Sequence, residues 1–544
     1  MSRKLLSVVL VLAMFITMLA ACAGNNGGSN EGSATNAPTN AGGSTNDATD
    51  PPAEPATDYG DTGGLVLPLV DKPTTITWMV VSENTGLNEK LFAKEIEKRT
   101  GITINFQPYS AATYADKLKV TVASGKLPDI FHGLTPAELK KIGQQNAVVA
   151  INEHADMLPN FKRMYMEEND WVMKSFADGS GKLYTWPVAN ISRDVNHGFL
   201  FRKDIFDKHG IKEWTNTDEF YQALKQLKEA YPDSYPYASK NKEFIFRDWA
   251  YGWGIGGHSY PTYYDESAKA WKYASVQPEH KEMLDFMKKL YNEGLLDPEF
   301  ITDTSDSWTA KMTNDKSFVT WDWIGRLDLF YNQVQATNPE YNLRYGNPVG
   351  PTGNGVTLGK IVDGFSIAVA NNDNKEAALK LLDYLTSPSG ATLVTMGVEG
   401  ETFTIGADGK AVYPELTDVP LVDISVLEER YGLWLQGMYV NSDPRSVYYN
   451  YTEKEQEAQD KRLAANNFEP IDPILAFTDE ENAKIAEIHT SLLKSANEFN
   501  VKYILDKSYG EQQWLDWQKN AEKMGSSQLA DIYNAAQQRY DAGN

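Results

Sequence analysis

Aromatic side chains crowd two short stretches of the sequence, and their chemistry is the first functional signal. Eight Trp or Tyr residues fall among the 25 positions from Trp249 to Tyr273, against an aromatic share of 12% for the whole chain. A second group, Trp321-Asp322-Trp323, ends a predicted strand. Trp and Tyr combine a flat apolar face with a polar edge, which suits the C–H faces and hydroxyls of sugar rings. Packing inside a core is the alternative for each ring, but the glycine-rich run 252–257 favours a loop, and Asp322 would place a polar group between two stacking rings.

Motifs for nucleotide or metal chemistry are incomplete. The run Gly252 to Gly257 matches a GxGxxG pattern, but it lies mid-chain rather than after the first strand of a dinucleotide-binding unit. Ile361 follows Lys360 where a phosphate-binding loop needs Ser or Thr, and none of the seven histidines forms an HExxH or HxH pattern. We therefore expect no cofactor, no metal site and no enzyme. A carboxylate pair for glycoside hydrolysis remains open, because that pairing is not local in sequence.

The charge balance narrows the range of partners. The chain has 74 Asp and Glu against 51 Lys and Arg, which gives a net charge of -23. Nucleic-acid binding needs clustered cations, and an anionic membrane surface would repel such a chain. A single cysteine excludes an intrachain disulfide and the Cys/His clusters that hold structural zinc.

The N-terminus has the layout of a secretory signal. Arg3 and Lys4 precede an almost unbroken apolar run over 5–20, which is shorter than the roughly 20 residues of a membrane-spanning helix. The run ends in Leu19-Ala20-Ala21-Cys22, which resembles the lipobox of bacterial lipoproteins, where the peptide is cut just before a cysteine that becomes lipidated. We predict a signal peptide over 1–21 and lipidation of Cys22. The alternative is an ordinary signal followed by an accidental cysteine.

A polar linker follows the signal. Residues 23–64 contain no Val, Ile, Leu, Met, Phe or Trp, so this stretch cannot bury enough surface to fold. We predict a disordered linker over 22–72, which would hold a body beginning at Pro73 away from the membrane.

The body opens with alternating strand and helix signals. Strands are predicted at 75–81, 102–106 and 129–131, with helices at 88–99 and 114–123 between them. This order predicts a parallel βαβαβ unit. Further strands are predicted at 198–201, 317–321 and 364–370. From Glu415 onward helical signals dominate, among them a capping box from Thr478 to Glu481.

Five short motifs, spread over most of the body in a fixed order, carry a resemblance to a known family. The chain resembles the extracellular solute-binding lipoproteins of ABC importers, in the carbohydrate-binding group called family 1, and in particular the LipO-like set of Gram-positive bacteria. The motifs are Gly125-Lys-Leu-Pro-Asp-Ile130, Gly181-Lys-Leu-Tyr-Thr-Trp-Pro-Val188, Phe201-Arg-Lys-Asp204, Ser387-Pro-Ser-Gly390 and Gly397-Val-Glu-Gly-Glu401.

The resemblance implies a two-lobed, periplasmic-binding-protein-like (type II) α/β fold, with a hinge between the lobes and a helix-rich C-terminal part. The first lobe would comprise 73–187 plus 360–415, and the second lobe 188–359 plus 416–544. The chain would cross between the lobes at 184–189, near 360–366 and near 400–409.

The same resemblance implies a ligand site built from loops of both lobes. For Glu83 and Asn84, helix capping is the alternative role. Some relatives that bind acidic polysaccharides carry an Asp-rich calcium loop, which the stretch 231–237 does not match, so no calcium site is expected. The residues matched to ligand-contacting positions are Glu83, Asn84, Trp249, Trp253, Trp321, Asp322, Trp323 and Glu399.

The function implied is that of a monomeric, lipid-anchored protein on the extracellular face of the membrane of a Gram-positive bacterium. It would capture a carbohydrate, expected to be an oligosaccharide, by closure of the lobes and deliver it to the permease subunits of an ABC transporter. Three alternatives remain open: a binding protein for a peptide or another polar solute, a tethered glycoside hydrolase, and a ligand-sensing partner of a membrane kinase.

Overall fold

The structure, a computed structural model, describes residues 57–419 and 421–543. The predicted signal peptide, Cys22 and the linker up to residue 56 lie outside the described residues. Within the described ranges, no helix is both long and apolar enough to cross a membrane.

A five-stranded sheet in the order β2-β1-β3-β10-β4 forms the centre of the first lobe. Strand β1 runs parallel to β2, with Thr74 opposite Ile102, and parallel to β3, whereas β10 is antiparallel to both β3 and β4. The predicted parallel βαβαβ opening is therefore confirmed. The elements of this lobe are β1 (Thr74–Val81), α1 (Leu91–Thr100), β2 (Ile102–Tyr109), α2 (Ala111–Ser124), β3 (Ile130–Phe131), α3 (Pro136–Gln144), α4 (Pro159–Phe161), α5 (Trp171–Phe176), β4 (Trp186–Ala189), β10 (Ile361–Val369), α12 (Lys375–Thr386), α13 (Pro388–Thr395), β11 (Thr404–Ile405), β12 (Ala411–Val412) and α14 (Ile424–Tyr431).

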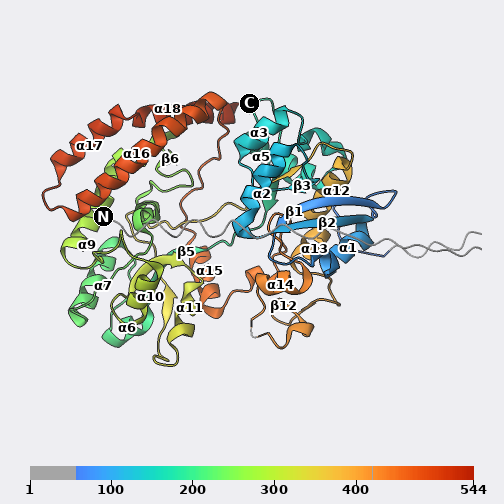
Figure 1. Cartoon of the computed structure of the whole chain (residues 1–544). Helices are drawn as coiled ribbons and strands as arrows, with labels where there is room; N and C mark the ends of the chain where they lie inside the picture. The colour runs from blue at the N-terminus through green and yellow to red at the C-terminus, as the bar shows by residue number, and fades with distance from the viewer. Residues whose placement is uncertain (1–56, 420, 544) are drawn as a thin grey trace, which may run out of the picture. The chain divides into compact units, whose positions relative to one another are not determined.

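Both faces of the first sheet are buried, as its run of apolar β-branched residues indicates. Trp78 and Val80 of β1 pack with residues of α1 and α12, and Met79 points to the opposite face, where it packs with α2. Figure 1 shows α12 and α13, drawn in orange, beside the blue strands β1 and β2, although about 300 residues separate them in the sequence.

A three-stranded antiparallel sheet in the order β8-β5-β9 forms the centre of the second lobe. Phe199 and Phe201 of β5 face one core, and Leu200 between them faces another core with α10, α11 and α15. The elements are β5 (His197–Arg202), α6 (Lys203–His209), α7 (Thr217–Ala230), α8 (Ile245–Ala250), β6 (Thr262–Asp265), β7 (Ala270–Tyr273), α9 (Pro278–Asn292), α10 (Ser305–Thr313), β8 (Val319–Trp323), α11 (Arg326–Val334), β9 (Leu343–Tyr345), α15 (Glu453–Ala465), α16 (Asp479–Leu505), α17 (Glu511–Lys523) and α18 (Ser526–Ala542).

The last three helices complete the second lobe, and the predicted helix-rich C-terminal part is confirmed. Helix α16 starts with the predicted capping box, in which Thr478 and Glu481 each bond the backbone of the other. Its inner face, with Leu492 and Phe499, packs in the same core as Leu284 of α9, and Figure 1 shows the two helices side by side.

The chain crosses between the two sheets three times, and the third crossing differs from the prediction. The first runs over 190–196, between β4 and β5, and the second over 346–360, between β9 and β10. The third was expected near 400–409, but there the chain enters the β11–β12 hairpin of 404–412, and Leu427, Leu433 and Val447 still pack in the core of the first lobe. The third crossing therefore lies near 448–452, and the predicted boundary at 416 is about 30 residues too early, because the 413–447 segment has no strand that would have marked its sheet.

The body begins earlier than predicted. Residues 59–72, expected to belong to the linker, form an irregular strap on the first lobe, in one compact unit with the rest of the body. Leu69 is 6% exposed in the first core, and Leu65, Leu67 and Val70 pack against that core. Burial of these apolar side chains against the first core stabilises the strap in this position.

Candidate functional site

The exposed end of β8 carries an aromatic surface of the second lobe. Trp323 pairs with His197, the first residue of β5, and remains 53% exposed. Trp321 is two residues earlier on the same face of the strand and is buried. The His197 ring lies between them, at 4.1 Å from the Trp323 ring centroid and 5.1 Å from that of Trp321. We call this edge, with Trp323, His197 and the segment 240–248 that leads into α8 beside it, the second rim.

Asp322 does not lie between the two tryptophan rings, as the sequence suggested. Because side chains alternate along a strand, it points to the opposite face, where it is 1% exposed. Its carboxylate accepts hydrogen bonds from Lys240 and from Nε of Arg326 at 3.1 Å. Asp322 thus fixes two cations under the second rim.

Helix α8 brings a buried acid to the same rim. Asp248 is 3% exposed, and its Oδ2 accepts a hydrogen bond of 2.7 Å from Asn241. Its Oδ1 lacks a hydrogen-bond partner among the described residues and lies 3.7 Å from the half-exposed guanidinium of Arg247. Burial raises the pKa of Asp248 to about 7 and lowers the pKa of His197 to about 4, so that the imidazole is neutral at neutral pH.

The raised pKa of Asp248 predicts a defined pH dependence of stability. Between about pH 4 and 7 the folded chain keeps the Asp248 proton that the unfolded chain has lost, so this group lowers the free energy of unfolding as the pH rises through that window. Asp248→Asn should therefore raise the free energy of unfolding by about 1–3 kcal/mol at pH 8 and change it little at pH 4. Urea unfolding of both chains at the two pH values measures this. Asp233→Asn, at an exposed position of the same lobe, should change neither value, and an equal gain at both pH values for Asp248→Asn would contradict the titration argument.

The predicted loop after β1 lies at the corresponding edge of the first sheet. Glu83 is exposed there. Asn84 accepts a hydrogen bond of 2.9 Å from the backbone N–H of Gly86, and Ser82 bonds Glu428 at 2.7 Å. Asn84 therefore shapes a turn ahead of the first helical segment and also lines a cavity of about 660 Å³ with Lys90 and Arg430. We call this edge, which also includes His132 after β3, the first rim.

Two of the predicted stacking residues are core residues in this structure. Trp249 and Trp253 are 1% and 4% exposed, and their rings stack on each other with centroids 6.0 Å apart. The indole N–H of Trp249 donates a hydrogen bond of 2.9 Å to the hydroxyl of Tyr237. Much of the aromatic crowding after Trp249 also serves packing, since Trp271 of β7 bonds Gln537 of α18.

Glu399 is not brought to either rim. It is exposed in the turn before β11, where its carboxylate lies 3.7 Å from the guanidinium of Arg445. Cys22, the predicted lipidation site, lies outside the described residues.

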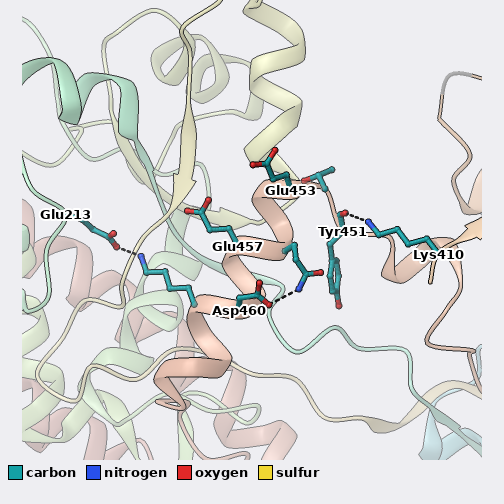
Figure 2. Close-up of a pocket in the computed structure, with 9 residues that line it drawn as sticks. Glu213, Lys410, Tyr451, Glu453, Glu457 and Asp460 are labelled. Carbon is teal, nitrogen blue, oxygen red and sulfur yellow. Dashed lines mark hydrogen bonds and ion pairs between the residues drawn. The ribbon is translucent and has the colours of Figure 1, made fainter. Parts of the chain in front are cut away.

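A second cavity has a different character (Figure 2). It measures about 860 Å³ and lies where Lys410 of the β11–β12 hairpin donates a hydrogen bond of 2.9 Å to the carbonyl of Tyr451. The lining is charged and offers one aromatic ring, which makes it poorly suited to sugar stacking; it consists of Glu213, Lys410, Tyr451, Thr452, Glu453, Gln456, Glu457, Asp460 and Lys461. Among the described residues, no group of three or more His, Cys, Asp or Glu side chains could hold a metal ion.

Comparison with known proteins identifies the class to which this chain belongs. A family model described as bacterial extracellular solute-binding protein matches residues 92–399, and the chain belongs to this family. Its members are substrate-binding proteins and not enzymes.

Three similar proteins illustrate the family. The fructooligosaccharide ABC transporter substrate-binding protein FusA of Streptococcus pneumoniae is 25% identical, over 88% of this chain and 92% of its own length. Lipoprotein LipO of Bacillus subtilis is 22% identical, over 81% of this chain and 88% of its own. The crystal structure of the alginate-binding protein AlgQ2 without calcium ion has a TM-score of 0.64 at 22% identity, and covers 87% of this chain and 99% of its own. This likeness confirms the predicted two-lobed fold.

Proposed function

We propose that this protein captures an oligosaccharide between its two rims on the extracellular face of the membrane and delivers it to an ABC transporter permease. Trp323, Glu83 and Asn84 would contact the ligand, with Trp321 and Asp322 supporting the second rim from behind. The protein would act as a monomer, held at the membrane by lipid on Cys22.

The observation that carries this proposal is the exposed ring of Trp323. A tryptophan that is 53% exposed, seated on a neutral histidine and flanked by buried charged groups, offers a ring face for stacking and hydrogen-bonding groups at its edge. Binding sites of small ligands combine such aromatic surface with a few well-placed polar groups. The name of FusA, which describes a fructooligosaccharide-binding protein, supports the same ligand class.

Lobe closure follows from the three crossings. A ligand that contacts both rims binds the closed arrangement more tightly than the open one, so it shifts the population toward closure. An ion pair of 2.6 Å between Lys360 and Asp194 joins the second crossing to the first. These crossings would bend together while the two sheets stay rigid.

A ligand screen tests the proposal. Neutral and acidic oligosaccharides and short peptides are added to the chain from residue 23, and thermal shift, calorimetry and analysis of the recovered ligand are read together. We expect an oligosaccharide to bind with micromolar or tighter affinity and to be recovered intact. A peptide hit without any sugar hit would overturn the carbohydrate assignment, and cleaved sugar would indicate a tethered hydrolase instead.

The lipid anchor is tested separately. Cells that express the full-length chain are grown with labelled palmitate, and Cys22→Ser is the matched variant. The label should be incorporated in the wild type only; equal labelling of both chains, or of neither, would rule out Cys22 as the anchor.

A further inference from the structure

The structure reveals a second aromatic surface that no local sequence signal joins together. Phe365 of β10, Tyr439 in the loop after α14 and Tyr448 at the third crossing are all half-buried. We call these three residues, with Gln436, the first-lobe strip. They come from three separate segments: the Phe365 ring contacts that of Tyr439, and the ring of Trp434 contacts both tyrosines.

Phe365 reaches the strip because the pairing of β10 with β4 is interrupted. The register shifts between Val362 and Ile367, and Ser366 has a positive φ of 54°. Such a bulge turns side chains away from the regular sheet faces. The Phe365 ring then lies 6.0 Å from His132 of the first rim and 5.3 Å, nearly perpendicular, from Tyr439.

The turn from Gln436 to Tyr439 is fixed against the first rim. Gln436 pairs with Val81 at the end of β1, which places the turn beside Glu83 and Asn84. Gly437 has a φ of 87°, and a Cβ atom there would lie 2.2 Å from the His132 ring. Only glycine allows this close approach, so the exposed amide of Gln436 and the ring of Tyr439 are held at the rim.

Trp434 connects the two tyrosines from below. It is 5% exposed, and its indole N–H donates a hydrogen bond of 2.7 Å to the carbonyl of Thr395. Its ring lies 5.1 Å from Tyr439 and 5.8 Å from Tyr448. A buried, hydrogen-bonded ring therefore gives both tyrosines a rigid base.

The polar groups of the strip indicate which ligand it suits. The hydroxyls of Tyr439 and Tyr448 make no hydrogen bond to a described residue, and burial raises the pKa of Tyr439 to about 12, so its hydroxyl stays a donor. The cation next to the strip, Arg193, is already engaged: its Nε and Nη2 donate to the carbonyl of Tyr448 at 2.9 and 2.6 Å. Ring faces, hydroxyls and an amide beside an arginine whose donors are already engaged match a neutral sugar better than a uronate.

We propose that the first-lobe strip is a carbohydrate subsite that stacks one neutral sugar ring of the oligosaccharide, beside the hinge. This inference rests on the proposed function and adds a subsite and a charge class to it. Arg193, in the first crossing, lies 4.9 Å from the ring centroid of Tyr448, in the third crossing. A sugar on Tyr448 would therefore bind where these two crossings contact each other.

The test compares variants of the full-length chain with two neutral probe series, sucrose to nystose and maltose to maltohexaose, and with oligogalacturonates as the acidic probe. Tyr439→Leu should weaken binding of the preferred neutral sugar about tenfold, and Tyr439→Phe, which loses only the hydroxyl, about threefold. Tyr235→Leu is the control, because Tyr235 is 40% exposed at the opposite end of the second sheet; its affinity should equal that of the wild type.

Hydroxyl-radical footprinting of the wild type provides a readout that does not depend on any variant. The bound sugar should protect Tyr439 and Tyr448 and leave Tyr235 unchanged. Neutral sugar binding with unchanged affinity in Tyr439→Leu, or with no protection of these tyrosines, would overturn the subsite, and a preference for oligogalacturonates would overturn its charge class. Failure of every sugar to bind the wild type would instead remove the proposed function and the subsite with it.

Discussion

Replacing Trp323 by Ala is expected to weaken oligosaccharide binding by about 10- to 100-fold, which corresponds to roughly 1.4–2.8 kcal/mol. The ring is 53% exposed at the end of β8, so it has surface left to bury against a sugar. Stacking adds about 0.5–1.5 kcal/mol beyond the area buried, and tryptophans at the centre of interfaces are frequent hot spots. Isothermal titration with the preferred sugar measures the loss.

The matched control is Tyr235→Ala, at the other end of the same sheet. Tyr235 is 40% exposed, and its N–H bonds Lys316 just before β8 begins. Both substitutions remove an exposed aromatic ring, so both should leave the midpoint of thermal unfolding nearly unchanged, while only Trp323→Ala should lose affinity. Trp323→Ala with wild-type affinity would show that the ligand does not stack at the second rim.

The elements with strong local signals could be predicted from the sequence. The opening βαβαβ unit follows from β-branched runs that alternate with amphipathic segments, and the start of α16 follows from a capping box of four residues. Both depend on residues within one or two helical turns, which a single sequence displays directly. The family's two-lobed fold was likewise recognisable from ordered motifs.

The site was harder to predict, because aromatic content does not reveal exposure. Trp249 and Trp323 have the same side chain, but the first lies on the buried face of α8 and the second ends an edge strand of the second sheet. Which ring is exposed depends on contacts such as that of Trp249 with Tyr237, 12 residues away. The first-lobe strip joins residues 365, 439 and 448, and only the tyrosine-rich run 448–451 was a visible signal for any part of it.

The start of the body was missed for a related reason. Composition predicts a linker up to Gly64. The next residues have neither strand nor helix periodicity, so the sequence places the boundary between linker and body at 73. The strap over 59–72 is instead held by tertiary contacts. Ser389 bonds the carbonyls of Tyr59 and Asp61, at 2.6 and 2.9 Å, and a Cβ on Gly63 would lie 1.7 Å from Asn160.

A chain that begins at residue 73 is therefore expected to be less stable than one that begins at 59, by about 2–4 kcal/mol. Removal of the strap exposes the part of the first core that Leu69 covers and loses the burial of a full leucine side chain, worth about 1.5–3 kcal/mol by itself. The net difference stays at a few kcal/mol, because the cost of ordering these 14 backbone residues offsets most of what all the contacts of the strap contribute. Urea unfolding of the two chains measures the difference. Where the two lobes unfold in separate transitions, the transition of the first lobe is compared.

Point variants within the strap distinguish burial from chain length. Leu69→Ala should lower the free energy of unfolding by about 2–3 kcal/mol, whereas Val66→Ala, at a position that is 82% exposed, should leave it within about 0.5 kcal/mol. Gly63→Ala and Gly64→Ala form a second pair: both residues have positive φ, but only Gly63 packs against Asn160, so its variant should lose more. Equal stability of the chains that begin at 59 and 73 would mean that the strap does not contribute to the first core. Because Leu69, Tyr59 and Gly63 of the strap contact the first lobe, its loss should lower the stability of that lobe and leave the affinity contributed by Trp323 unchanged.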